Sequence, residues 1–331
     1  MIASRRVTFT ALREAALQPF QVTEPGEAEV LVETERTLMS IGTEAIVYSR
    51  SFAPGTHWDN WVKYPFYPGY CAVGRVIAAG AAAKVQVGQR VALRGGHAAH
   101  HVLAEDKVFP VPDGIDPAVA SWFALAKIAF MGALKAEFTL GDQVLVIGAG
   151  PIGQMALRWA VAAGASRVSV VDTAAHRLET ARLGGATLTI AKPIDAAMEE
   201  LRAHHGGQLP RVVIDSTGNA AVFAHALAAV RDHGRVVLLG DTGRPAEQHL
   251  TSDLITRGLQ VVGAHDTHNN AQWNNRTITE LFFSLVQSGR FRLDGLNTDT
   301  FAPEACAEAY AATETRRAGM LGVVFNWGAT A

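Results

Sequence analysis

The stretch QVLVIGAGPIG, residues 143–153, decides the fold. Four apolar residues in succession predict a buried strand, and the glycines that follow are spaced as in a turn that binds the pyrophosphate of a dinucleotide. Gly148 permits the tight turn, Gly150 lets the backbone approach the pyrophosphate, and Gly153 lets the following helix pack closely on the strand. The spacing therefore predicts a dinucleotide-binding turn between a strand and a helix.

The residues beyond the turn extend this pattern. Pro151 and Ile152 open the predicted helix, whose N-terminus presents free N–H groups and the positive end of the helix dipole to the phosphates. Asp172, nineteen residues after Gly153, ends the next predicted strand, where a carboxylate can accept both ribose hydroxyls. Because this charge would repel a 2′-phosphate, the sequence favours NAD(H), while Arg177 keeps NADP(H) possible. Two alternatives are a turn that binds S-adenosylmethionine and a glycine turn without a ligand.

Strands and helices alternate from about residue 121 to residue 265, which is typical of a doubly wound parallel sheet. Residues 1–120 contain short β-rich runs between glycine and proline breaks, which predict a compact, largely antiparallel β domain. The strands expected there are 28–32, 74–79, 89–93 and 101–109. Those expected in the parallel sheet are 143–147, 167–171, 187–190, 212–214, 235–239 and 260–263, with helices at 174–183, 194–204 and 220–230. Two further helices, 277–288 and 303–313, and a strand at 321–327 follow.

Composition limits the classes of protein that fit. The 331 residues are enough for two domains, and 49% hydrophobic with 18% charged residues is an ordinary globular balance. A net charge of −2 without charged blocks argues against nucleic acid or an anionic membrane as partner. Two cysteines, the lack of a signal-peptide pattern and the lack of a long apolar run predict a cytoplasmic protein with no membrane span.

Several short motifs outside the glycine turn occur in the order of a known family. They are GTE at 42–44, PGY at 68–70, GRV at 74–76, VGQRV at 87–91 and DSTG at 215–218. With these motifs the chain resembles the medium-chain dehydrogenase/reductase superfamily over nearly its whole length. The resemblance implies an α/β fold in which a GroES-like β domain, residues 1–120 and 266–331, receives an inserted Rossmann domain, residues 121–265. It also implies an active site between the domains, with Thr217 and His265 near the cofactor.

The chain departs from the zinc-dependent members of that superfamily. Ile41 stands where they have a cysteine ligand and Tyr70 where they have a histidine ligand, and Cys71 alone cannot form a tetrahedral site. In those members a lobe with four closely spaced cysteines, which holds a structural zinc, follows the strand that ends here at Leu93. This lobe is missing, because Leu93 is followed directly by Arg94-Gly95-Gly96. We therefore expect no metal. In this respect the chain is similar to a zinc-lacking subgroup that includes bacteriochlorophyllide-type dehydrogenases.

Without a metal, hydrogen bonds must stabilise the developing alkoxide. Thr43 stands where zinc-dependent relatives use a hydroxyl to relay the substrate proton, and Tyr70 would point into the emptied metal pocket, so these two are the predicted catalytic residues. The alternatives are a hydroxyl that stabilises a turn and a ring that only fills space. Lys127 either lies near the nicotinamide ribose or is a surface lysine.

Aromatic residues are concentrated between residues 52 and 67. His57, Trp58, Trp61 and Tyr64 are the predicted substrate-binding residues of an aromatic lid over a bulky or planar substrate. Packing of a long loop and an oligomer contact are the alternatives.

These observations predict a zinc-independent NAD(P)-dependent oxidoreductase that interconverts an alcohol and a ketone or aldehyde. The first alternative is an enone or quinone reductase that uses NADPH, and the second is a noncatalytic dinucleotide-binding protein. The strands at 235–239 and 260–263 come late in the inserted domain, where an exposed sheet edge favours a homodimer.

Overall fold

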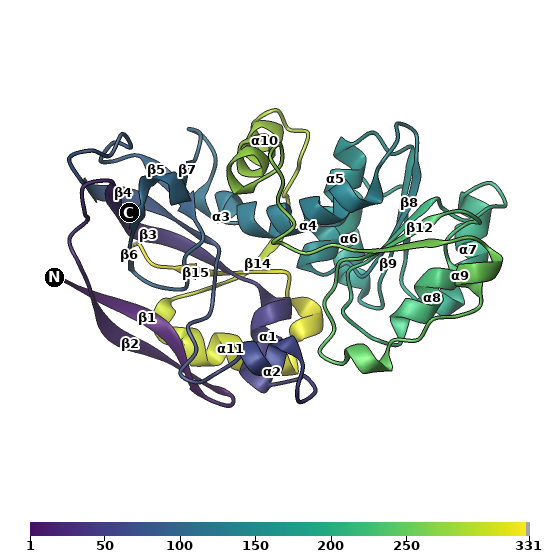
Figure 1. Cartoon of the computed structure of the whole chain (residues 1–331), viewed down its shortest axis with the longest axis horizontal. Coiled ribbons are helices and arrows are strands. Elements are labelled where there is room, and N and C mark those ends of the chain that lie inside the picture. Colours follow the sequence, from purple (N-terminus) through teal and green to yellow (C-terminus); the bar gives the residue numbers. More distant parts are fainter. Residues whose placement is uncertain (329–331) are drawn as a thin grey trace.

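The computed structural model describes residues 1–328 and has two lobes, one on each side of Figure 1. One lobe holds a six-stranded, all-parallel sheet in the order β10-β9-β8-β11-β12-β13. Its strands are β8 (Gln143–Ile147), β9 (Arg167–Val171), β10 (Leu188–Ile190), β11 (Val212–Asp215), β12 (Arg235–Leu238) and β13 (Gln260–Gly263). This is the doubly wound order of a Rossmann sheet, as the sequence predicted.

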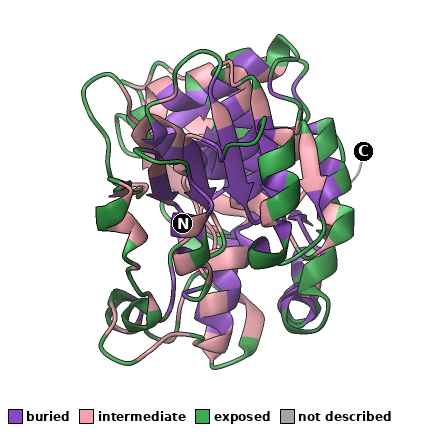
Figure 2. Ribbon diagram, turned by 90° about the vertical axis from the view of Figure 1, so that its right-hand side faces the viewer, coloured by how far each residue is buried: buried purple, intermediate pink, exposed green. Residues whose placement is uncertain are grey.

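Helices cover both faces of the parallel sheet, so that its strands are enclosed (Figure 2). Val144 and Val146 of β8 belong to one apolar core, and Leu145 and Ile147 belong to another on the opposite face. The helices of this lobe are α4 (Phe123–Ala136), α5 (Pro151–Ala162), α6 (Ala175–Leu183), α7 (Met198–His204), α8 (Val222–Ala228) and α9 (Asp253–Thr256).

The other lobe is built on a seven-stranded, mainly antiparallel sheet. The C-terminal strands β14 (Asn297–Phe301) and β15 (Gly322–Asn326) join the N-terminal strands beside β3 (Glu29–Met39), so the two ends of the sequence build one sheet (Figure 1). This arrangement confirms the predicted fold class. The remaining strands are β4 (Ala72–Ala79), β5 (Arg90–Leu93), β6 (His100–Ala104) and β7 (Val108–Pro110).

Some elements of this lobe differ from the sequence-based expectations. The hairpin of β1 (Ile2–Ala11) and β2 (Glu14–Val22) was not predicted, because β2 is largely half-exposed and lacks a clean alternation of apolar and polar residues. The strand expected at 101–109 is divided by the 3₁₀ turn Glu105–Lys107. The residues after Ser40 form a helix, α1 (Ile41–Ser49), where the GTE motif had indicated a turn. Shorter helices are α2 (His57–Trp61) and α3 (Pro117–Ala120).

Residues 117–136 are the one helical stretch in 1–328 that is long and apolar enough to cross a membrane. Two-thirds of it, 67%, is buried within the fold, as expected for the central helix of a globular core. The core around α4 also includes α10 (Asn275–Gln287). In contrast, α11 (Cys306–Thr315) packs in the lobe of the mainly antiparallel sheet, against α1 and β2.

The domain boundaries at 120/121 and 265/266 and the homodimer remain predictions. The strand β13 does form an edge of its sheet.

Candidate active site

The glycine turn has the geometry that a bound pyrophosphate needs. Gly148 has a φ of +92°, which favours glycine, and a Cβ on Gly153 would meet the carbonyl oxygen of Gly148 and lie 2.7 Å from Ser216 Oγ. A Cβ on Gly150 would meet only the Arg177 guanidinium, 3.8 Å away. The space over Gly150, in front of the N-terminus of α5, is therefore open and could hold a phosphate.

The Asp172 carboxylate is fixed at the rim of this turn. Its Oδ2 accepts a hydrogen bond from the Ala149 N–H at 2.6 Å, and its Oδ1 accepts one from the Ala174 N–H at 2.7 Å. A cavity of about 300 Å³ opens beside it, and Gly148 and Thr217 also line that cavity. Each carboxylate oxygen retains a lone pair for a ribose hydroxyl, so the residues present fit the adenosine half of a dinucleotide.

The other predicted cofactor residues lie in different surroundings. Thr217 donates its hydroxyl to the Asp215 carboxylate at 2.7 Å and lies in the wall of the cavity. Arg177 donates to the Met320 carbonyl at 3.1 Å and so ties α6 to the other lobe. Pro151 and Ile152 begin α5, as expected. His265 is exposed beyond β13, and its Nδ1 lies 2.8 Å from Thr267 Oγ1.

Replacing Asp172 by Ser tests the cofactor assignment. We expect NADH binding to weaken by about 1–3 kcal/mol, since hydrogen bonds to a charged acceptor are lost. The change is measured as the dissociation constant of NADH by fluorescence titration. Glu199→Ser is the matched control and should leave NADH affinity unchanged, because Glu199 is an exposed carboxylate that does not line this cavity. Unchanged NADH affinity together with a wild-type preference for NADPH would contradict the assignment.

Three hydroxyl groups meet near the N-terminus of α1. The Tyr70 hydroxyl donates to Ser40 Oγ at 2.5 Å and lies 3.5 Å from Thr43 Oγ1, the outer limit for a hydrogen bond. Burial is the main cause that raises the pKa of the Tyr70 phenol above its ordinary value. The phenol therefore stays protonated at neutral pH and is suited to donate a hydrogen bond. The structure thus brings together the two predicted catalytic residues and adds Ser40.

A buried polar network holds α1 in place. Glu44, only 2% exposed, accepts hydrogen bonds from the Ser40 N–H at 2.7 Å and the Tyr310 hydroxyl at 2.5 Å. The His97 Nε2 lies 2.9 Å from the same carboxylate, and its Nδ1 lies 2.7 Å from Thr37 Oγ1. Because Ser40 and Thr43 stand at the start of this helix, Glu44 fixes the position of both hydroxyls.

A charged cluster lies over the Tyr70 ring at the junction of the lobes. The guanidinium carbon of Arg94 is 5.2 Å from the ring centroid, and Arg94 also forms an ion pair with Asp266. The Lys127 Nζ lies 2.8 Å from Asp266 Oδ1, and its side chain is 3% exposed. Burial lowers the pKa of Lys127, and Asp266 counteracts that shift. Two cations thus share one carboxylate next to the hydroxyl groups, with Lys127 buried rather than on the surface.

The aromatic segment contains both buried and exposed side chains. Trp58 is 4% exposed and belongs to the core beneath α1, and the Tyr64 hydroxyl donates to the Val47 carbonyl at 2.9 Å. Trp58 therefore has little surface left for a substrate, while Tyr64 is half-buried, and the aromatic lid stays a prediction. Trp61 is 53% exposed, and His57 lies 2.9 Å from Asp241 of the other lobe.

Comparison with known proteins places the chain in a family. Residues 151–281 match a family described as zinc-binding dehydrogenase. An L-threonine 3-dehydrogenase of Anaeromyxobacter dehalogenans (strain 2CP-1 / ATCC BAA-258) is 32% identical over 246 residues, which cover 73% of this chain and 67% of the relative. The chain belongs to the zinc-binding dehydrogenase family. It is therefore an NAD(P)-dependent enzyme, and the predicted superfamily is confirmed, while membership of the zinc-lacking subgroup remains a prediction.

A further relative and a solved structure extend the match to nearly the whole chain. The L-threonine 3-dehydrogenase of Anaeromyxobacter sp. (strain K) is 28% identical over 93% of this chain and 94% of its own length. A crystal structure from Sinorhizobium meliloti 1021, described as a zinc-binding dehydrogenase bound to NADP, superposes with a TM-score of 0.82 at 19% identity. The superposition covers 98% of this chain and 100% of the Sinorhizobium meliloti chain, so the two proteins share a fold.

The residues at the expected metal position of this zinc-binding dehydrogenase do not fit zinc. Ile41 has no donor atom, Tyr70 stands at the position expected for a histidine ligand, and the single thiol of Cys71 cannot form a tetrahedral zinc site. The cations Arg94 and Lys127 lie nearby. Within residues 1–328 no cluster of three or more His, Cys, Asp or Glu side chains could hold a metal.

Sequence reasoning missed four residues of this site: Ser40, Glu44, Arg94 and Asp266. Glu44 was visible as part of the GTE motif, but the motif gave no indication of its buried partners. Nothing local marks Arg94 and Asp266 as a pair, because 172 positions separate them.

Proposed function

We propose that this dehydrogenase interconverts an alcohol and a ketone or aldehyde without zinc and prefers NAD(H). The observation that carries the proposal is the Tyr70 hydroxyl, hydrogen-bonded to Ser40 and close to Thr43, beneath the Arg94 guanidinium. Asp172 supports the cofactor preference. Location in the cytoplasm, a homodimeric state and a bulky or planar substrate bound by the aromatic segment remain predictions.

Bound NAD(H) supplies or accepts the hydride. In carbonyl reduction, Tyr70 donates a hydrogen bond and then its proton to the carbonyl oxygen. As the phenol gives its only proton to the substrate, the Ser40 hydroxyl, 2.5 Å away, turns to donate its proton to Tyr70 and is itself reprotonated from solvent, while Thr43 lies on the same side. In alcohol oxidation a proton moves in the opposite direction, from the substrate hydroxyl through Tyr70 and Ser40 to solvent.

The charged cluster supplies the electrostatic part of the mechanism. Arg94 and Lys127 carry two positive charges against the one negative charge of Asp266, which leaves a net charge of +1. A fixed positive charge in a site with little water stabilises an oxygen that becomes negative, which is the effect that a metal would otherwise provide. The cluster therefore supports carbonyl chemistry at a metal-free site.

Steady-state consumption of NADH with a panel of ketones, aldehydes and enones tests this function. We expect turnover with at least one ketone or aldehyde and an alcohol as the product, identified by mass spectrometry. The matched control is Asp172→Ser, which should raise the KM for NADH. Reduction of the carbon–carbon double bond of enones, with no turnover of saturated carbonyls, would instead favour the enone reductase.

A further inference from the structure

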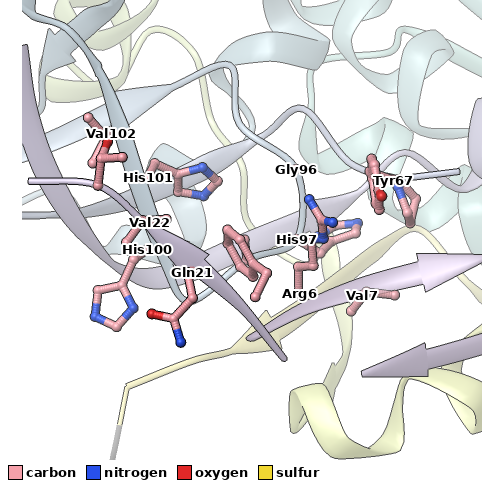
Figure 3. Close-up of a pocket in the computed structure, with 14 residues that line it drawn as sticks. Arg6, Val7, Gln21, Val22, Tyr67, Gly96, His97, His100, His101 and Val102 are labelled. Atoms are coloured by element: carbon pink, nitrogen blue, oxygen red, sulfur yellow. The ribbon is translucent and has the colours of Figure 1, made fainter. Parts of the chain in front are cut away.

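A second cavity, of about 410 Å³, lies in the lobe that holds β1 and β2. In Figure 3 Arg6 and Tyr67 stand at one end of it and His100, His101 and Val102 at the other. Figure 1 shows this hairpin on the side of the molecule away from the parallel sheet. The cavity shares no lining residue with the cavity beside Asp172, so it is separate from the cofactor site.

Arg6 is a cation without a carboxylate partner. Its guanidinium carbon lies 3.7 Å from the centroid of the Tyr67 ring and 4.7 Å from that of the Phe20 ring. Its Nε is buried and has no hydrogen-bond partner, and Arg6 takes part in no ion pair in the described part of the chain. The neighbouring Arg5, by contrast, is paired with Glu304 at 2.5 Å. A buried, unpaired donor on a charged group is costly unless a ligand satisfies it.

The other polar groups of the cavity are compatible with an anion. The Nε2 of His101 is also buried without a partner among residues 1–328, and burial lowers the pKa of this imidazole to about 4. His101 is therefore neutral near pH 7 and can place one N–H towards a ligand. No aspartate or glutamate lines the cavity, so no negative charge opposes the Arg6 guanidinium there.

We propose that this cavity binds a small organic anion, whose carboxylate or phosphate group is bound by Arg6. The planar guanidinium matches the geometry of such groups, and the two rings beside it keep its orientation fixed. The rest of the ligand lies on the apolar walls formed by Phe20, Val22 and Val102. The volume falls within the usual range of small-molecule sites, about 300–1,000 Å³.

Calorimetric titration of the whole protein tests this site, with saturating NADH present so that the cofactor site is occupied. The probes are benzoate, inorganic phosphate and the neutral isostere benzamide. We expect benzoate or phosphate to bind and benzamide to bind at least about tenfold more weakly, because the charge-assisted hydrogen bonds are missing. Tighter binding of benzoate indicates a carboxylate ligand, and tighter binding of phosphate indicates a phosphorylated one.

Variants tie the binding to this cavity. Arg6→Gln should lower the affinity for the tighter anion at least about tenfold. Arg5→Gln, one position away and exposed, should leave it unchanged. Gln21→Trp fills the cavity from an exposed position on β2, leaves Arg6 in place and should also abolish binding. This variant keeps the test valid if the Arg6→Gln protein fails to fold. The proposal is wrong if neither anion binds, if benzamide binds as tightly, or if the Gln21→Trp protein binds like wild type.

Discussion

The Tyr70→Phe enzyme is expected to turn over about 10- to 1000-fold more slowly than wild type, with folding and NADH binding little changed. The variant keeps the ring that fills the expected metal pocket and removes only the hydroxyl, so it separates packing from chemistry. Because burial raises the pKa of this phenol, its loss removes a proton donor rather than a base. The measurements are kcat and KM for the best carbonyl substrate, with circular dichroism and NADH titration.

Matched variants make this result specific. Tyr67→Phe removes a hydroxyl from a half-exposed ring three residues earlier and should leave kcat unchanged. Thr43→Val should reduce kcat less than Tyr70→Phe does, since its hydroxyl is 3.5 Å from the phenol. The double variant should lose less than the product of the two effects, because both groups act on one oxygen. Full activity of Tyr70→Phe would leave Tyr70 as a space-filling residue and make Lys127 or His265 the next candidate.

Replacing Glu44 by Ala should lower the free energy of unfolding by about 3–5 kcal/mol, the range for breaking a buried charged network from one side. The substitution leaves the Ser40 N–H, the His97 ring and the Tyr310 hydroxyl without their acceptor. Each of these groups remains buried and cannot be fully solvated. The loss is measured by urea unfolding followed by fluorescence.

Glu24→Ala is the control for this stability effect. Glu24 is a carboxylate whose side chain is 69% exposed, so its removal should change the free energy of unfolding by less than about 0.5 kcal/mol. A loss below about 1 kcal/mol in Glu44→Ala would show that α1 does not depend on the network.

The cofactor half of the protein could be predicted from the sequence because its signals are local. The strand, the glycine turn, the helix and Asp172 lie within thirty residues, and each has a fixed backbone role. The burial of alternate residues of β8 on opposite faces follows from the same short pattern.

The catalytic half depends on contacts between distant residues, which a single sequence does not reveal. Glu44 meets Tyr310 across 266 positions, and Arg94 meets Asp266 across 172. The aromatic segment shows the same limit. Composition does not distinguish Trp58, whose ring packs in the core beneath α1, from Trp61, whose ring is exposed, although both belong to one short helix.

The central claim, carbonyl chemistry without zinc, is tested most directly by measuring metal content and turnover in the same preparation before and after treatment with a chelator. We predict far less than about one zinc per chain and unchanged turnover after chelation, because Ile41, Tyr70 and Cys71 together do not provide the ligands of a zinc site. About one tightly bound zinc per chain, with activity that is lost on its removal and restored by adding it back, would contradict the claim.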